Sequence, residues 1–156
     1  MGINIDEVHG IVEIKSDVFV SERVRISGVG TGVAYASGDA FGSVLTFEVP
    51  KKGIISNVIF IDVDDEGIQK DLIIFPRYFT PTPDNDPFNV TDEFTQLALG
   101  WVRILDFMDL NNSQIGKATP ALDYEAPEGR LYCQLITRGA DNIAAGSLPY
   151  IFLTIR

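Results

Sequence analysis

Residues 54–63 (IISNVIFIDV), the acidic turn 62–67 (DVDDEG) and residues 71–75 (DLIIF) together indicate the fold class of this chain. Successive side chains of a β-strand point to opposite faces, so a strand with one face in water alternates apolar and polar residues. Both alternating sets of residues 54–63 are largely apolar, which predicts a central strand or an interface strand. The acidic turn and the extended pattern after it predict a hairpin with a polar loop.

Similar extended patterns occur on both sides of this region. Leu45, Phe47 and Val49 alternate with polar residues, as in a half-buried strand. Three further segments are strand candidates: residues 101–108, 131–137 and 149–155. Residues 80–87 contain three prolines, which lack the amide donor of a ladder, so we predict a surface loop there.

One short amphipathic helix is predicted over about residues 91–99. Thr91 can cap it, Asp92 and Glu93 suit its positive end, and Gly100 can end it. Its apolar residues recur at helical spacing: Phe94, Leu97, Ala98 and Trp101. Many short strands with a single helix predict an all-β fold, an antiparallel β-sandwich of the jelly-roll kind.

Length and composition restrict the organisation of the chain. Its 156 residues fit one packed domain, which we place at residues 23–156, and residues 1–22 form an extended N-terminal arm in this interpretation. The formal net charge of −10 disfavours nucleic acid as a partner, because phosphates are bound by cationic surfaces. No stretch approaches the roughly 20 apolar residues of a membrane helix, and the first residues lack the pattern of a secretory signal. We therefore expect a soluble protein with no membrane partner.

Catalytic chemistry finds little support in the sequence. His9 is the only histidine and Cys133 the only cysteine, so a disulfide within the chain is impossible and a Cys/His zinc site lacks ligands. Cys133 alternates with Leu131 and Leu135, which is typical of a buried strand position. We predict no catalytic residue, no cofactor and no enzymatic activity.

The acidic turn is the best candidate for a cation site. Asp62, Asp64 and Glu66 occupy positions 1, 3 and 5 of a calcium-loop register, and Gly67 occupies position 6. Position 12 falls on Ile73, where such a loop requires a bidentate glutamate. We therefore interpret the turn as a solvated loop, with these three acidic residues as weak calcium candidates.

An ordered set of motifs resembles a family of tailed-bacteriophage virion proteins. The motifs run in order from about residue 23 to the end of the chain: residues 35–42 (YASGDAFG), 59–64 (IFIDVD), 72–75 (LIIF), 84–88 (DNDPF) with 91–92 (TD), 131–132 (LY) and 137–139 (TRG). In these motifs the chain resembles virion structural proteins of the capsid decoration or head cement kind.

The resemblance implies a non-enzymatic structural protein, made in the host cytoplasm, that binds the outer surface of the phage capsid. Its partners would be the major capsid protein and further copies of itself, as a homotrimer or another homo-oligomer. Expected interface residues lie in the arm and among the aromatic residues: Ile3, Ile5, Val8, Ile11, Val18, Val20, Tyr78 and Trp101. The arm could also add a strand to the open sheet edge of a neighbour.

Two alternatives remain open at this point. The first is another virion role, as a structural component of the tail, neck or baseplate. The second is a carbohydrate-binding module or small hydrolase that uses the acidic loops and aromatics such as Trp101. Separated carboxylates on different strands could serve such a hydrolase, but their separation requires the structure.

Overall fold

The computed structural model of the chain describes residues 2–6, 11–15, 17–29 and 31–156. It contains thirteen strands and one helix in the described residues. The elements are β1 (Gly2–Asp6), β2 (Ile11–Lys15), β3 (Phe19–Val20), β4 (Val24–Arg25), β5 (Ala40–Glu48), β6 (Lys52–Asp62), β7 (Lys70–Phe75), α1 (Asp92–Thr95), β8 (Gly100–Ile104), β9 (Asp106–Asp109), β10 (Gln114–Ala118), β11 (Leu122–Glu125), β12 (Arg130–Thr137) and β13 (Tyr150–Ile155). No helix in this part of the chain has the length and apolarity needed to cross a membrane.

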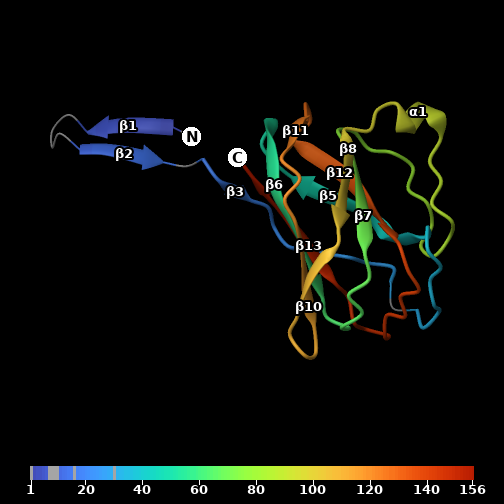
Figure 1. Cartoon of the computed structure of the whole chain (residues 1–156). Coiled ribbons are helices and arrows are strands. Elements are labelled where there is room, and N and C mark those ends of the chain that lie inside the picture. The colour runs from blue at the N-terminus through green and yellow to red at the C-terminus, as the bar shows by residue number, and fades with distance from the viewer. Residues whose placement is uncertain (1, 7–10, 16, 30) are drawn as a thin grey trace.

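Two antiparallel sheets pack face to face as a β-sandwich, which confirms the predicted fold class (Figure 1). The seven-stranded sheet has the order β3-β13-β6-β10-β9, with β11 also paired to β6 and β4 to β13. The four-stranded sheet has the order β5-β12-β7-β8. The core lies between the sheets because alternate residues of each strand point inward, among them Val58 and Phe60 of β6 and Leu72 and Ile74 of β7.

The predicted hairpin of β6 and β7 is wrong, because these strands belong to different sheets. β6 is a central strand between β13 and β10, as its two-sided apolar pattern predicts, whereas β7 pairs with β12 and β8. Residues 63–69 therefore cross from one sheet to the other. Asp65 and Gly67 have positive φ angles of 59° and 62°, which allow the tight turn of this crossing.

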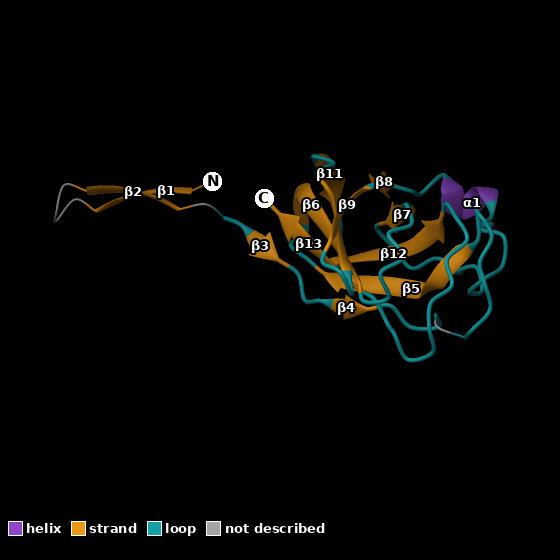
Figure 2. Ribbon diagram, turned by 60° about the horizontal axis from the view of Figure 1, so that its bottom comes forward, coloured by secondary structure: helices purple, strands orange, loops and turns teal. Residues whose placement is uncertain are grey.

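Residues 76–99 cover part of the outer face of the four-stranded sheet, and we call them the cap (Figures 1 and 2). Phe75, Phe79 and Tyr132 form a small buried cluster under the cap, and Phe94 of α1 packs against it. The helix is shorter than the predicted 91–99 and ends at Thr95. After α1 the chain makes two tighter turns and then joins the sheet, where the Leu99 amide donates to the Ile74 carbonyl at 2.8 Å.

The first strands of the chain form a separate two-stranded sheet that extends away from the sandwich in Figure 1. Register places Ile3 opposite Ile14 and Ile5 opposite Val12 in this antiparallel pair. Farther along the predicted arm, β3 already pairs with β13 at the edge of the seven-stranded sheet.

Candidate functional site

The outer face of the seven-stranded sheet carries a continuous row of apolar residues. Met108 pairs with Ile115, Ile115 with Ile61, and Ile61 with Tyr150, so the row crosses four neighbouring strands. Beside it, Ile59 of β6 pairs with Phe152 of β13. We call this set the apolar band: Ile59, Ile61, Met108, Ile115, Tyr150 and Phe152.

The side chains of the apolar band are partly or largely exposed. Met108 is 66% exposed and Ile115 36%, while the other members are half-buried by their neighbours on the sheet. An apolar surface that is continuous over several strands, unlike single exposed apolar residues, is typical of a contact with another protein. The band can therefore bind an apolar partner surface by hydrophobic burial.

Charged residues border the apolar band at both ends. At the β4 end, the Arg23 guanidinium lies 4.5 Å from the Phe152 ring centre and that of Arg25 lies 5.8 Å from the Tyr150 ring centre. At the β9 end, Asp106 pairs with Lys117, and Lys117 in turn pairs with Ile59. This arrangement of an apolar centre with a charged rim is the usual composition of a protein interface.

Part of the apolar band follows from the sequence pattern. The two-sided pattern of residues 54–63 predicted a central strand or an interface strand, and Ile59 and Ile61 of β6 face outward in the band. Met108 and Ile115 were not singled out, because β9 and β10 are short strands with charged neighbours and no clear alternation. Pairing with β6 brings their side chains onto the same face.

The described residues among the predicted interface set lie in several elements of the chain. Val18, Val20, Tyr78 and Trp101 are all exposed, but they lie before β3, in β3, in the cap and in β8 respectively. Tyr78 also packs edge to face against Tyr132 at 5.9 Å between ring centres. Ile3 and Ile5 lie in β1 and Ile11 in β2, whereas Val8 lies outside the described residues.

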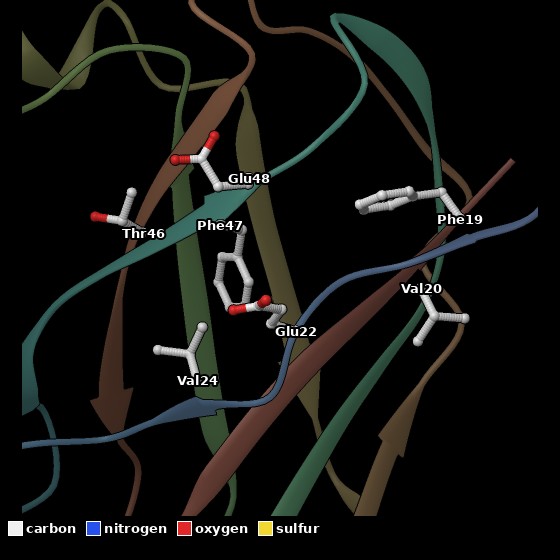
Figure 3. A pocket seen from close by; sticks show the side chains of 7 residues that line it. All are labelled: Phe19, Val20, Glu22, Val24, Thr46, Phe47 and Glu48. Carbon is white, nitrogen blue, oxygen red and sulfur yellow. The ribbon is translucent and has the colours of Figure 1, made fainter.

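A cavity of about 330 Å³ opens where the edges of the two sheets meet (Figure 3). It lies between β3 and β4 on one side and β5 on the other. Its lining is mostly apolar, with two carboxylates: Phe19, Val20, Glu22, Val24, Thr46, Phe47 and Glu48. Glu22 and Glu48 supply its two carboxylates and Thr46 its hydroxyl.

The carboxylate of Asp62 organises the acidic turn instead of projecting into solvent. Its Oδ1 accepts from the Asp64 amide, and its Oδ2 accepts from the amides of Glu66 and Gly67, each at 2.9 Å. Asp64 in turn accepts from the Ala144 amide at 2.7 Å and so ties the turn to the loop before β13. In the part of the chain that the structure describes, no group of three or more His, Cys, Asp or Glu side chains has a metal-binding arrangement.

Next to the turn lies a buried ion pair that the sequence did not reveal. Lys70 Nζ and Asp141 Oδ1 are 3.0 Å apart, and both side chains are 1% exposed. Burial lowers the pKa of Lys70 and raises that of Asp141, while their mutual attraction opposes both shifts. Burial is also the largest cause of a raised pKa at Glu66, followed by the charge of Asp141. Lys70 and Asp141 are 71 residues apart, so no local pattern links them.

Cys133 and His9 are the two residues that the sequence analysis considered for nucleophilic chemistry. Cys133 is fully buried between the sheets, and burial raises the pKa of its thiol well above the usual range. His9 lies outside the described residues. Among the surfaces described above, the apolar band spans the largest number of strands.

Comparison with known protein families and with curated proteins finds no match to this chain.

Proposed function

We propose that this chain is a non-enzymatic virion structural protein, a decoration or cement protein on the outer surface of a tailed-phage head. The apolar band is the observation that carries the proposal, because it gives a stable β-sandwich a surface suited to another protein. The motif resemblance described under the sequence analysis is the reason for proposing a phage head as the assembly.

The charge of the chain supports a position on the outside of the shell. With a formal net charge of −10, the protein is repelled by the dense polyanion of a packaged genome. The major capsid protein is the partner that this function requires. Binding at several equivalent places would stabilise the shell by linking neighbouring capsid subunits.

The same proposal includes contacts between copies of the chain. Arg23 and Asp106 lie at opposite ends of the apolar band, so two bands in antiparallel contact bring unlike charges together at both ends. A contact of this kind buries the apolar side chains of both copies. Homotrimers and other closed oligomers would need a second surface.

Co-sedimentation with undecorated heads of the encoding phage tests this function, with detached tails as the control. We expect binding to heads at a ratio related to capsid symmetry, together with greater survival of the shell on heating. Ile115→Asp places a charge in the band and should lower head binding, whereas Leu97→Asp, at an exposed site near α1, should not. Binding to tails would favour a tail, neck or baseplate component, and binding to neither particle would contradict a virion role.

A further inference from the structure

The open half of the outer face of the four-stranded sheet holds a cluster of two arginines, one aspartate and a tryptophan. Register places Asp71 of β7 beside Arg103 of β8, and Ile73 beside Trp101. Arg138 follows the end of β12 on the same face. These side chains line a hollow of about 240 Å³ beside the cap, which we call the Trp–Arg site: Asp71, Ile73, Trp101, Arg103, Ile136 and Arg138.

Asp71 holds both arginines in place. Its side chain is 5% exposed, Oδ1 accepts from Arg103 Nε at 3.2 Å, and Oδ2 accepts from Arg138 Nε at 2.7 Å. Each guanidinium is therefore oriented through its inner nitrogen. Within the described residues, the terminal Nη groups of the two arginines make no hydrogen bond, and both side chains reach solvent.

Trp101 forms the second wall of the site. The Arg103 guanidinium lies 4.9 Å from the centre of the Trp101 ring, and 57% of Trp101 is exposed. Stacking on the ring limits the motion of Arg103, so little conformational entropy remains to be lost when a ligand binds. Tryptophan and arginine are also the residues most enriched at the energetic centres of protein interfaces.

The charge balance of the site defines the ligand it fits. Two guanidiniums and one carboxylate leave one positive charge in excess, on a chain whose formal net charge is −10. Guanidinium groups with free Nη donors bind a carboxylate through two parallel hydrogen bonds. Trp101 stays 57% exposed beside the two arginines, so its ring is accessible to the same ligand.

We propose that the Trp–Arg site binds a carboxylate side chain in an acidic segment of a partner protein. The Nη groups of Arg103 and Arg138 hold the carboxylate, and the Trp101 ring packs against the adjoining methylene groups or backbone. The site lies on the opposite sheet from the apolar band, and it holds whether or not the protein belongs to a virion.

Fluorescence titration with an acetylated, amidated hexaglutamate peptide tests the site. Trp101 is the only tryptophan of the chain, so every fluorescence change reports on this place. We expect a saturable change that weakens as salt is added, and none with hexaglutamine of the same length. Isothermal titration calorimetry gives the affinity independently of the fluorophore.

Variants separate a built site from general charge attraction. Arg103→Gln and Arg138→Gln should each weaken the binding of hexaglutamate at least about tenfold, within the range for hydrogen bonds to charged groups. Arg130→Gln is the matched control, because Arg130 also pairs with a carboxylate, that of Glu48, but does not line the Trp–Arg site. The affinity of this variant for hexaglutamate should stay unchanged. Arg103→Lys keeps the positive charge and should still weaken binding, because lysine lacks the planar guanidinium that donates two parallel hydrogen bonds to a carboxylate.

Asp71→Asn gives the sharpest result. It removes one negative charge, so simple electrostatic attraction predicts tighter binding of the anionic peptide. Loss of the carboxylate that orients both arginines predicts weaker binding instead. We expect weaker binding in a variant whose thermal unfolding shows that it is folded; if Asp71→Asn does not fold, Arg103→Lys decides in its place. Tighter binding to Asp71→Asn, full affinity in both glutamine variants, or no saturable response to hexaglutamate would overturn the proposal. Saturable binding of hexagalacturonate without hexaglutamate would assign the site to acidic glycans instead.

Discussion

The two sheets of the sandwich differ in what covers their outer faces. On the four-stranded sheet, the cap encloses Phe75 and Tyr132 and adds Phe79 to form a small second core. On the seven-stranded sheet, the apolar band keeps Met108 and Ile115 exposed in the described residues. Both faces carry apolar side chains at alternating positions. The comparison teaches that similar apolar sheet faces differ in their cover: a loop of the same chain encloses one, and the other stays exposed.

Polar anchors explain why the cap stays on its sheet. The buried side chain of Gln134 accepts from the Thr82 amide at 3.0 Å and donates to the Thr82 and Gly42 carbonyls at 2.7 and 3.0 Å. Asp84 accepts from the Gly42 amide at 2.7 Å and from the Tyr35 hydroxyl. No comparable anchors hold a segment over the apolar band within the described residues.

Phe79→Ala should have the largest effect on stability, because it empties the centre of the covered face. Phe79 is fully buried, and its ring centre lies 4.2 Å from that of Phe75. Loss of the ring should lower the free energy of unfolding by about 3–5 kcal/mol, measured by urea denaturation. Met108→Ala, in the uncovered band, is the control and should change it by less than about 0.5 kcal/mol. Equal losses in both variants would contradict the distinction between the faces.

Gln134→Leu should release the cap while keeping the size of the side chain. The change leaves the Thr82 amide and carbonyl without partners, at a cost of about 1–3 kcal/mol for each buried group that stays unpaired. We expect a loss of about 2–3 kcal/mol in urea denaturation and faster tryptic cleavage after the exposed Arg77. Gln96→Leu, at an exposed position after α1, should leave the free energy of unfolding and the rate of tryptic cleavage unchanged. Unaltered cleavage after Arg77 would show that Gln134 does not anchor the cap.

Alkaline pH should weaken the other anchor of the cap, through Tyr35. Its hydroxyl lies 2.8 and 2.9 Å from the two carboxylate oxygens of Asp84. Burial, followed by this hydrogen bond and the charge of Asp84, raises the pKa of Tyr35 above its ordinary value. The folded pKa exceeds the unfolded one, so the contribution is complete below about pH 10 and is lost as the pH rises further.

Tyr35→Phe tests this pH dependence. It should lower the free energy of unfolding by about 1–2 kcal/mol at neutral pH and reduce its decline above pH 10. Tyr124→Phe is the control, since burial raises the pKa of Tyr124 to about 12 while its hydroxyl donates to the Pro50 carbonyl, away from the cap. Both variants should reduce the decline of the free energy of unfolding above pH 10, but only Tyr35→Phe should speed tryptic cleavage after Arg77. A decline that persists unchanged in both would require another titrating group.

The sequence predicts the features that depend on local pattern. The two-sided apolar pattern of residues 54–63 correctly indicates a central strand, and the capping residue Thr91 correctly locates the start of α1. It does not predict that β6 and β7 separate into two sheets, because a hairpin and a crossing both need a polar turn. Gln134 and Thr82 are 52 residues apart, so the anchor of the cap is visible only once the strands are paired.

The Trp–Arg site likewise depends on contacts between residues that are distant in the sequence. Trp101 was counted from the sequence among the apolar residues of the predicted helix and among the expected interface residues, whereas the structure places it in β8 with 57% of the residue exposed. Its neighbours come from different strands: Asp71 from β7 and Arg138 after β12. Single charged residues in these strands look like ordinary surface residues, and only the register of the sheet reveals that they share one carboxylate.

Ile115→Asp should have the smallest effect on stability, and it tests directly whether the uncovered sheet face binds another protein. Ile115 lies on the uncovered face and is 36% exposed, so the change should lower the free energy of unfolding by only about 1 kcal/mol, the span of strand propensities. If the band joins copies of the chain, the buried charge should raise the dissociation constant of the oligomer at least about tenfold, since an unpaired buried charge is strongly unfavourable. Sedimentation equilibrium measures this, with Leu97→Asp as the control.

The result also decides which partner covers the band. A chain that is monomeric in solution, but loses head binding with Ile115→Asp, would assign the band to the capsid protein. A chain whose self-association and head binding both survive Ile115→Asp would show that an apolar sheet face can stay uncovered. In that case an apolar sheet face does not need to be covered. The cap would then lie over its sheet only because Gln134 and Asp84 anchor it.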